Sequence, residues 1–249
     1  YEWFNPLYKS DVNRYVDQYM LPQLKDLVER YKPDLVWPDG EWEHPSATWR
    51  SEEFLAWLFN ESSAPKDVAI NDRWGKECRE NHGGFGTPEY QHRSDGRLSK
   101  AGLFEECQGM GMSFGYNRNE SAENYRSTEK LLELLVNTVS RGGNLLLDIG
   151  PTADGRIPEI MEQRLLEMGE WLAVNGEAIY GTDRWDKAPE LEKVRFTQKD
   201  GAVYAICLGW PGEKLAFPNV TKAKSAEAVM LGLDGPLAAS AAPDTVSVT

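Results

Sequence analysis

Charged side chains follow two short apolar segments of the sequence, in a pattern that can bring reactive groups together. In "DLVWPDGEWEH" the apolar run 35–37 is ended by a Pro and a Gly that flank Asp39. A continuous apolar run without alternation is typical of a strand buried on both faces. In "KDVAINDRWG" the run 68–70 is followed in the same way by Arg73. A carboxylate and a guanidinium are therefore predicted near the carboxyl ends of two strands.

Three further residues, Glu89, Glu105 and Phe114, are expected at or near the ends of strands. In parallel α/β folds, active sites form where the carboxyl ends of strands meet the loops. Carboxylates, an arginine and exposed aromatic rings suit a carbohydrate, because rings cover the apolar faces of sugars and two carboxylates can flank the bond that is cut. The sequence has no Ser-His-Asp set, phosphate loop or dinucleotide glycine pattern that would favour another chemistry.

Each of these residues also has an ordinary structural interpretation. An Asp-Gly pair after a strand is usually only a turn, which would leave Asp39 without a catalytic role. Arg73 can form a structural ion pair, and Trp37 and Phe114 can be core residues. The shared location of the set, rather than any single residue, favours a functional site.

Amphipathic helices are predicted at four places, because apolar residues recur there at helical spacing. Their ranges are 12–31, 51–60, 127–141 and 157–175. Pro22 is expected to kink the first helix or to mark its effective start. Ser51 and Ser127 are expected to cap the second and third helices, because a serine oxygen can accept a hydrogen bond from a first-turn N–H.

Short strands are predicted between these helices at 34–37, 68–70 and 144–150, with one or two more around 103–107 and 112–116. Buried strands that alternate with amphipathic helices are typical of a parallel α/β sheet. After Trp185 the sequence "KVRFTQKDGAVYAICLGW" alternates at period 2 around Lys-Asp-Gly, which predicts a β-hairpin. We therefore expect a domain boundary near 182–188.

The composition excludes several functional classes. A formal net charge of −13 over 249 residues makes nucleic acid and anionic membranes poor partners. No apolar run approaches the ~20 residues of a transmembrane helix. Three separated cysteines and three histidines without ligand spacing make a metal site improbable. The first residues show no signal-peptide pattern, and a first residue that is Tyr suggests trimming, processing or a fragment.

Five motifs, in this order, closely resemble the α-L-fucosidases of glycoside hydrolase family 29 over about residues 1–210. They are "YKPDLVWPDGEWE", "VAINDRWG", "SFGYNRNE", "VSRGGNLLLDIGPTADGRI" and "GEWLAVNGEAIYGTDRW". The resemblance implies a (β/α)8-like catalytic barrel followed by a small β-sandwich. It implies hydrolysis of terminal α-L-fucose with retention of configuration, and no metal or organic cofactor.

The resemblance also implies roles for single residues. Asp39, which ends the "PDLxWxDG" strand of the family, corresponds to the nucleophile that forms a covalent glycosyl–enzyme intermediate. Trp37 corresponds to a residue that lines the fucose pocket, and Arg73 to an arginine that contacts the sugar. Phe114 corresponds to an aromatic residue that packs near the methyl group of fucose.

Two glutamates compete for the role of general acid/base. Glu89 in "TPEY" resembles the "TAEY" of bacterial relatives and is the better match. Glu105 in "FEEC" occupies the place of the "WE" motif of the family and is the alternative. The residue in this role protonates the leaving oxygen and then activates water.

The chain departs from the family pattern at its beginning and near its end. It starts about where the third barrel strand ends, so we expect a partial barrel of about five βα units over 1–184 and a shortened β domain over 185–249. Asp148 stands where the family usually has the Asn of "LLNIGP". Either an active fucosidase or an impaired fragment that at most binds sugar fits this pattern.

A partial barrel leaves two edge strands and an apolar inner face without partners. We therefore expect a homo-oligomer whose interface includes roughly residues 1–31. A separate chain that carries the N-terminal half of the barrel is the other possibility.

Overall fold

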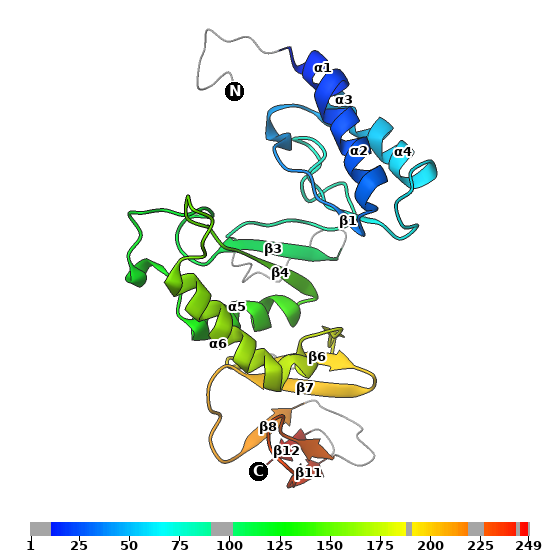
Figure 1. The fold of residues 1–249 in the computed structure, drawn as a ribbon. Helices are drawn as coiled ribbons and strands as arrows, with labels where there is room; N and C mark the ends of the chain where they lie inside the picture. Colours follow the sequence, from blue (N-terminus) through cyan, green and yellow to red (C-terminus); the bar gives the residue numbers. More distant parts are fainter. Residues whose placement is uncertain (1–10, 91–101, 188–190, 219–226, 243–244, 249) are drawn as a thin grey trace. The chain divides into compact units, whose positions relative to one another are not determined.

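The computed structural model describes residues 11–90, 102–187, 191–218, 227–242 and 245–248. The chain divides into two compact units, each of which is described here by itself. The first contains 1–88 and 92–105, and the second contains 89–91 and 106–249. Helices and strands occur in both units (Figure 1), so the predicted α/β content is confirmed, while the partial barrel of about five βα units stays a prediction.

The first unit begins with one continuous helical stretch, drawn in dark blue in Figure 1. It consists of α1 (Val12–Tyr15), a π-helical turn η1 (Val16–Met20) and α2 (Leu21–Tyr31). The helix predicted over 12–31 is confirmed. Pro22 lies in the first turn of α2, directly after the π-helical turn, so it marks the start of that helix within the continuous stretch.

Two short strands, β1 (Leu35–Val36) and β2 (Ala69–Ile70), pair in parallel. They lie within the ranges that the sequence predicts. The expectation that β1 is buried on both faces is wrong, because Leu35 is 41% exposed while Val36 is 8% exposed.

The short helices α3 (Ser46–Trp49) and α4 (Ser51–Asn60) complete this unit, together with the 3-10 turn η2 (Glu41–Glu43). The prediction that Ser51 caps α4 is wrong. Arg50, in the left-handed conformation, precedes the helix, and the Ser51 hydroxyl donates to the backbone oxygen of Trp74 at 2.5 Å. Because Ser51 is buried, its hydroxyl ties α4 to the "NDRWG" segment instead of to its own first turn.

A hydrophobic core joins α1, α2 and α4 to the two strands. Phe54 of α4 stacks on Trp74 with a ring separation of 5.7 Å. The other buried members are Val16, Leu21, Val28, Val36, Leu58, Val68 and Cys78. This core fixes the segments that leave β1 and β2.

The second unit contains β4 (Gly143–Asp148), which pairs with β3 (Phe104–Gly109), and the helices α5 (Thr128–Val139) and α6 (Glu159–Asn175). β3 runs from the first unit into the second. Ser127 caps α5 as predicted, since its oxygen accepts from the Lys130 N–H at 3.3 Å. A 3-10 turn, η3 (Ala122–Asn124), precedes α5 and another, η4 (Gly176–Ala178), follows α6.

The strand predicted at 112–116 is wrong, since the chain bends there. A Cβ added at Gly109 would lie 2.4 Å from the Ser113 carbonyl oxygen, so the backbone turns back on itself too closely for an extended strand. Met112 is 76% exposed as a result.

The predicted hairpin is confirmed by β6 (Val194–Lys199) and β7 (Ala202–Cys207), to which β5 (Asp183–Arg184) adds a third strand. Asp200 and Gly201 have φ values of 50° and 83°, as a tight two-residue hairpin turn requires. The remaining strands are β8 (Leu215–Pro218), β9 (Ala228–Val229), β10 (Pro236–Leu237), β11 (Ala239–Ala242) and β12 (Thr245–Val248). The domain boundary at 184/185 stays a prediction.

No helix in the described part of the chain has the length and apolar character needed to cross a membrane.

Candidate active site

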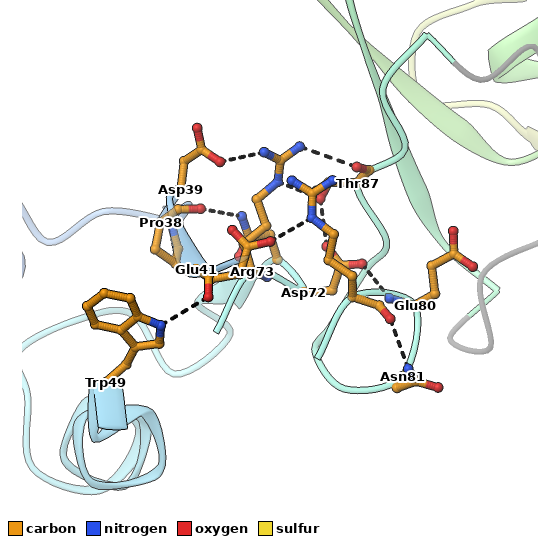
Figure 2. Close-up of polar contacts among 11 residues, drawn as sticks. Pro38, Asp39, Glu41, Trp49, Asp72, Arg73, Glu80, Asn81 and Thr87 are labelled. Carbon is orange, nitrogen blue, oxygen red and sulfur yellow. Dashed lines mark hydrogen bonds and ion pairs between the residues drawn. The ribbon is translucent and has the colours of Figure 1, made fainter. Parts of the chain in front are cut away.

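The parallel pairing of β1 with β2 brings Asp39 and Arg73 together. The register pairs Leu35 with Ala69, and Arg73 follows Asp39 by the same 34 positions. Asp39 and Arg73 therefore lie the same number of residues beyond their paired strands, and their side chains meet. The Arg73 Nη1 donates to Asp39 Oδ1 at 2.6 Å (Figure 2).

The Asp39 carboxylate is presented with one oxygen bound and one oxygen available. Its side chain is 51% exposed, and Oδ2 has no hydrogen-bond partner among the described residues. In Figure 2 this second oxygen points away from Arg73. Gly40, with a φ of 100°, lets the chain turn immediately after Asp39 into η2. An ionised carboxylate held in this way can act as a nucleophile.

The Arg73 side chain is only 1% exposed, and several groups hold its guanidinium. Nε donates to Thr87 Oγ1 at 2.8 Å, and Nη2 donates to the Thr87 carbonyl oxygen at 3.3 Å. The guanidinium also lies over the Trp37 ring, 4.3 Å from its centroid. The guanidinium is therefore fixed in place before any substrate binds.

Glu105 belongs to the same cluster. The Trp37 indole Nε1 donates to Glu105 Oε1 at 2.7 Å. The first unit thus brings together four of the predicted residues, Trp37, Asp39, Arg73 and Glu105.

Glu89 and Phe114 belong to the second unit. Glu89 forms an isolated parallel bridge with Cys107. Phe114 is 37% exposed and packs edge-to-face on the Tyr90 ring at 4.8 Å. The Tyr90 hydroxyl in turn accepts from the Gly109 N–H at 3.1 Å. Tyr90, the neighbour of Glu89 in the sequence, therefore contacts both the end of β3 and the Phe114 ring.

Buried charged residues surround the Asp39–Arg73 pair. Asp72 Oδ1 accepts from the Thr87 hydroxyl at 2.6 Å, and Oδ2 accepts from the Glu80 N–H at 2.8 Å. Glu41, whose side chain is 4% exposed, accepts from Arg79 Nε at 2.6 Å. Sequence reasoning missed Thr87, Asp72 and Glu41 as parts of the site.

A thiol nucleophile does not fit this region. Burial raises the pKa of Cys78, and the neighbouring carboxylates of Glu77, Glu52 and Asp72 raise it further. Since the thiolate is the reactive form, this cysteine is inert near neutral pH. Among the described residues, no group of three or more His, Cys, Asp or Glu side chains could hold a metal ion.

The sequence model of the α-L-fucosidase family matches residues 1–177. The chain belongs to this family. It is 43% identical to the tissue α-L-fucosidase of Rattus norvegicus over 249 residues, and 41% identical to the α-L-fucosidase of Dictyostelium discoideum over 246 residues. These alignments cover 95% and 94% of this chain, and 53% of each relative.

Solved α-L-fucosidase structures have the same fold over nearly all of the chain. The Thermotoga maritima α-fucosidase in complex with a mechanism-based inhibitor is 35% identical, with a TM-score of 0.75 over 95% of this chain and 52% of that one. The α-L-fucosidase isoenzyme 1 of Paenibacillus thiaminolyticus is 27% identical, with a TM-score of 0.82 over 99% of this chain and 60% of that one. The chain therefore spans about half the length of the family members that it matches.

Two of the three missed residues, Asp72 and Glu41, had a weak signal in the sequence. Asp72 stands directly beside Arg73 in "NDRWG", and Glu41 follows the Asp-Gly pair, so both are charged residues next to a predicted buried strand. Burial of such a residue requires a partner. Thr87 gave no signal, because its role depends on a contact with residues 14 and 15 positions away.

Proposed function

We propose that the chain is a retaining glycoside hydrolase that releases terminal α-L-fucose from glycoconjugates or oligosaccharides. The observation that carries the proposal is the Asp39–Arg73 pair, because it holds one carboxylate oxygen at 2.6 Å and leaves the other available for attack. Membership of the α-L-fucosidase family supports fucose as the sugar. One of the related Thermotoga maritima structures is a complex with fucose.

In the proposed first step, Asp39 Oδ2 attacks the anomeric carbon as the bond to the leaving oxygen breaks. The general acid gives its proton to that oxygen, and the sugar becomes an ester of Asp39. In the second step the same residue, now a base, takes a proton from water, which attacks the anomeric carbon and frees Asp39. Two inversions give net retention.

For the general acid/base we propose Glu89, with Glu105 as the alternative. The motif "TPEY" supports Glu89. The contact of Glu105 with Trp37, whose ring stacks on Arg73, supports the alternative. Trp37, Arg73 and Phe114 are proposed to contact the sugar.

The alternative function is that of an impaired fucosidase fragment that at most binds sugar. The match to the rat enzyme covers 53% of that relative. Hydrolysis of a chromogenic α-L-fucoside by the purified chain, with Asp39→Ala as a control, decides between the two. Proton NMR of the first product distinguishes retention, which gives α-L-fucose, from inversion. Fucose binding without hydrolysis would support the alternative and exclude the enzyme.

We also propose that the chain forms homo-oligomers. Along α1, η1 and α2, four large apolar residues are half exposed or more and lie four or eight residues apart: Tyr15, Tyr19, Leu27 and Tyr31. They make one stripe along the helical stretch. Residues 1–10 of the predicted interface lie outside the described residues.

A further inference from the structure

We propose that Thr87 and Asp72 are positioning residues that hold Arg73 in its contact with Asp39. This inference rests on the proposed function of Asp39 as nucleophile. Asp72, Arg73 and Thr87 are 3%, 2% and 2% exposed, so their polar groups depend on one another (Figure 2).

The direction of the hydrogen bonds through Thr87 is fixed by chemistry. The Arg73 Nε can only donate, and an ionised Asp72 can only accept. The Thr87 hydroxyl therefore accepts from Arg73 at 2.8 Å and donates its hydrogen to Asp72 Oδ1 at 2.6 Å. The result is a one-directional chain from a cation through a hydroxyl to a carboxylate. The backbone carbonyl oxygen of Thr87 is a second acceptor for the same guanidinium.

Asp72 is itself held in place. Its second oxygen accepts from the Glu80 N–H at 2.8 Å, so both carboxylate oxygens have partners. The side chain of Asn71 donates to the Pro38 carbonyl oxygen at 3.0 Å, which ties the segment before Arg73 to the segment before Asp39. The hydroxyl of Thr87 is thus the link between a rigid carboxylate and the guanidinium.

The contacts from Arg73 through Thr87 to Asp72 matter differently at the two steps of the proposed reaction. Before attack, the charge of Arg73 is balanced by Asp39. When Oδ2 of Asp39 becomes part of a glycosyl ester, the negative charge of Asp39 is lost and Oδ1 is left as a neutral, weaker acceptor, while the contact of Arg73 with Thr87 and, through it, with Asp72 is unchanged. Asp72 therefore helps to keep Arg73 in place while the ester waits for water, and the contact with Asp39 regains its full charge when Asp39 is freed. Both steps use this geometry, so its loss lowers kcat more than it raises KM.

The test uses two substitutions at one position. Thr87→Val has the same shape but no hydroxyl, and Thr87→Ser keeps the hydroxyl. With a chromogenic α-L-fucoside, we expect Thr87→Val to lower kcat by about 10- to 100-fold and to change KM by less than about threefold, the range for losing a hydrogen bond to a charged group. Thr87→Ser is expected to restore kcat to within about fivefold of the starting protein. A kcat of Thr87→Val equal to that of Thr87→Ser overturns the proposal.

A double-mutant cycle separates positioning from a general structural effect. If Thr87 acts through Arg73, adding Thr87→Val to Arg73→Lys causes less than about a threefold further loss. A purely structural effect multiplies instead, and this outcome also overturns the proposal. Asp72→Asn keeps an acceptor for the Thr87 hydroxyl but loses the charge and the acceptor for the Glu80 N–H, so it should also lower kcat, and an unchanged kcat would overturn the role of Asp72.

A readout without turnover distinguishes this proposal from the proposed function. In protein labelled with 15N-arginine, Arg73→Lys identifies the Arg73 Nε–H resonance. We expect this proton to exchange slowly with water and to do so at least about tenfold faster in Thr87→Val, since a buried hydrogen bond protects it. A protected Nε–H in a chain without fucosidase activity rejects the proposed function and retains the positioning role. Rapid exchange in the unsubstituted chain overturns the positioning role itself.

Discussion

Arg73 donates to Asp39 at 2.6 Å although 1% of the arginine side chain and 51% of the aspartate side chain are exposed. The cation is thus part of the buried structure, while the carboxylate faces solvent. We predict that Asp39→Gly loses nearly all fucosidase turnover, because the attacking oxygen is gone. Added azide should restore part of the turnover by attacking the open anomeric face in place of the carboxylate.

The control for this prediction is Asp34→Asn, since Asp34 is an exposed aspartate at the other end of β1. It should keep the turnover of the unsubstituted chain. Turnover of Asp39→Gly equal to that of this control would eliminate Asp39 as the nucleophile.

The choice of general acid can be decided with Glu89→Gln and Glu105→Gln. An amide cannot supply a proton, but at Glu105 it still offers an oxygen to the Trp37 indole, so the packing of that ring is kept. We expect Glu89→Gln to slow fucosides with poor leaving groups by roughly 100-fold or more, and activated aryl fucosides far less, since these need no proton. The measurement is kcat/KM over a series of aryl fucosides. The same pattern in Glu105→Gln alone would transfer the role to Glu105.

The sequence predicted the parts of the site that depend on local pattern. Asp39 and Arg73 each follow a short apolar run, and the pairing of those runs decides that the two side chains meet. The helices at 12–31 and 127–141 were recognised because apolar spacing and Ser127 are local signals as well.

What the sequence could not predict depends on contacts between distant segments. Ser51 has the type of a helix cap, but the carbonyl oxygen of Trp74 competes for its hydroxyl and Arg50 takes the cap position. Thr87 carries no chemistry by itself and gains a role only from Asp72 and Arg73. Single-chain periodicity contains no information on such pairings.

The exposed stripe on α1, η1 and α2 predicts self-association of the chain. Replacement of Tyr19 and Leu27, which are 55% and 52% exposed, by lysine should shift the mass measured by light scattering to that of a monomer. Lysines bring the net charge of −13 closer to zero, so general repulsion between copies does not increase, and the lost apolar contact together with the cost of burying a charge at the interface accounts for dissociation. Leu166→Lys, at a 63% exposed position on α6, is the control. A monodisperse monomer before any substitution would refute the prediction.

Asp148 should make stability depend on pH. Burial raises its pKa above the ordinary 3.8, and a hydrogen bond from the Ile149 N–H opposes this effect. A raised pKa means that the folded state holds the proton more tightly than the unfolded state. The stabilisation is therefore complete below the unfolded pKa and is lost as pH rises through the folded pKa.

An uncharged amide at this position avoids that loss. We expect Asp148→Asn to raise Tm by about 1–3 °C at pH 7, in line with a fraction of a kcal/mol in a chain of this size. The difference should shrink as the pH falls through the raised folded pKa and below the unfolded value of 3.8, toward about pH 3, where the carboxyl group is protonated in both states. Thermal unfolding of both proteins over this pH range checks it. A Tm difference that does not change with pH would show that charge is not the cause.

Gly75 ends the "NDRWG" segment where it passes the start of α3. A Cβ at this position would lie 2.3 Å from the Ser46 nitrogen and 2.7 Å from the Ser46 Cα. These are backbone atoms, so no change of rotamer can make room. We predict that Gly75→Ala lowers the free energy of unfolding by about 2–3 kcal/mol, the upper part of the range for overpacking.

The matched control is Gly169, in the exposed middle of α6, where an added Cβ would have no neighbouring atom within 4 Å. Gly169→Ala should instead stabilise the protein by roughly 0.5–1 kcal/mol, because alanine favours the helix. Urea unfolding of the two variants measures both signs, and a Gly75→Ala protein as stable as Gly169→Ala would show that α3 does not pack against this glycine.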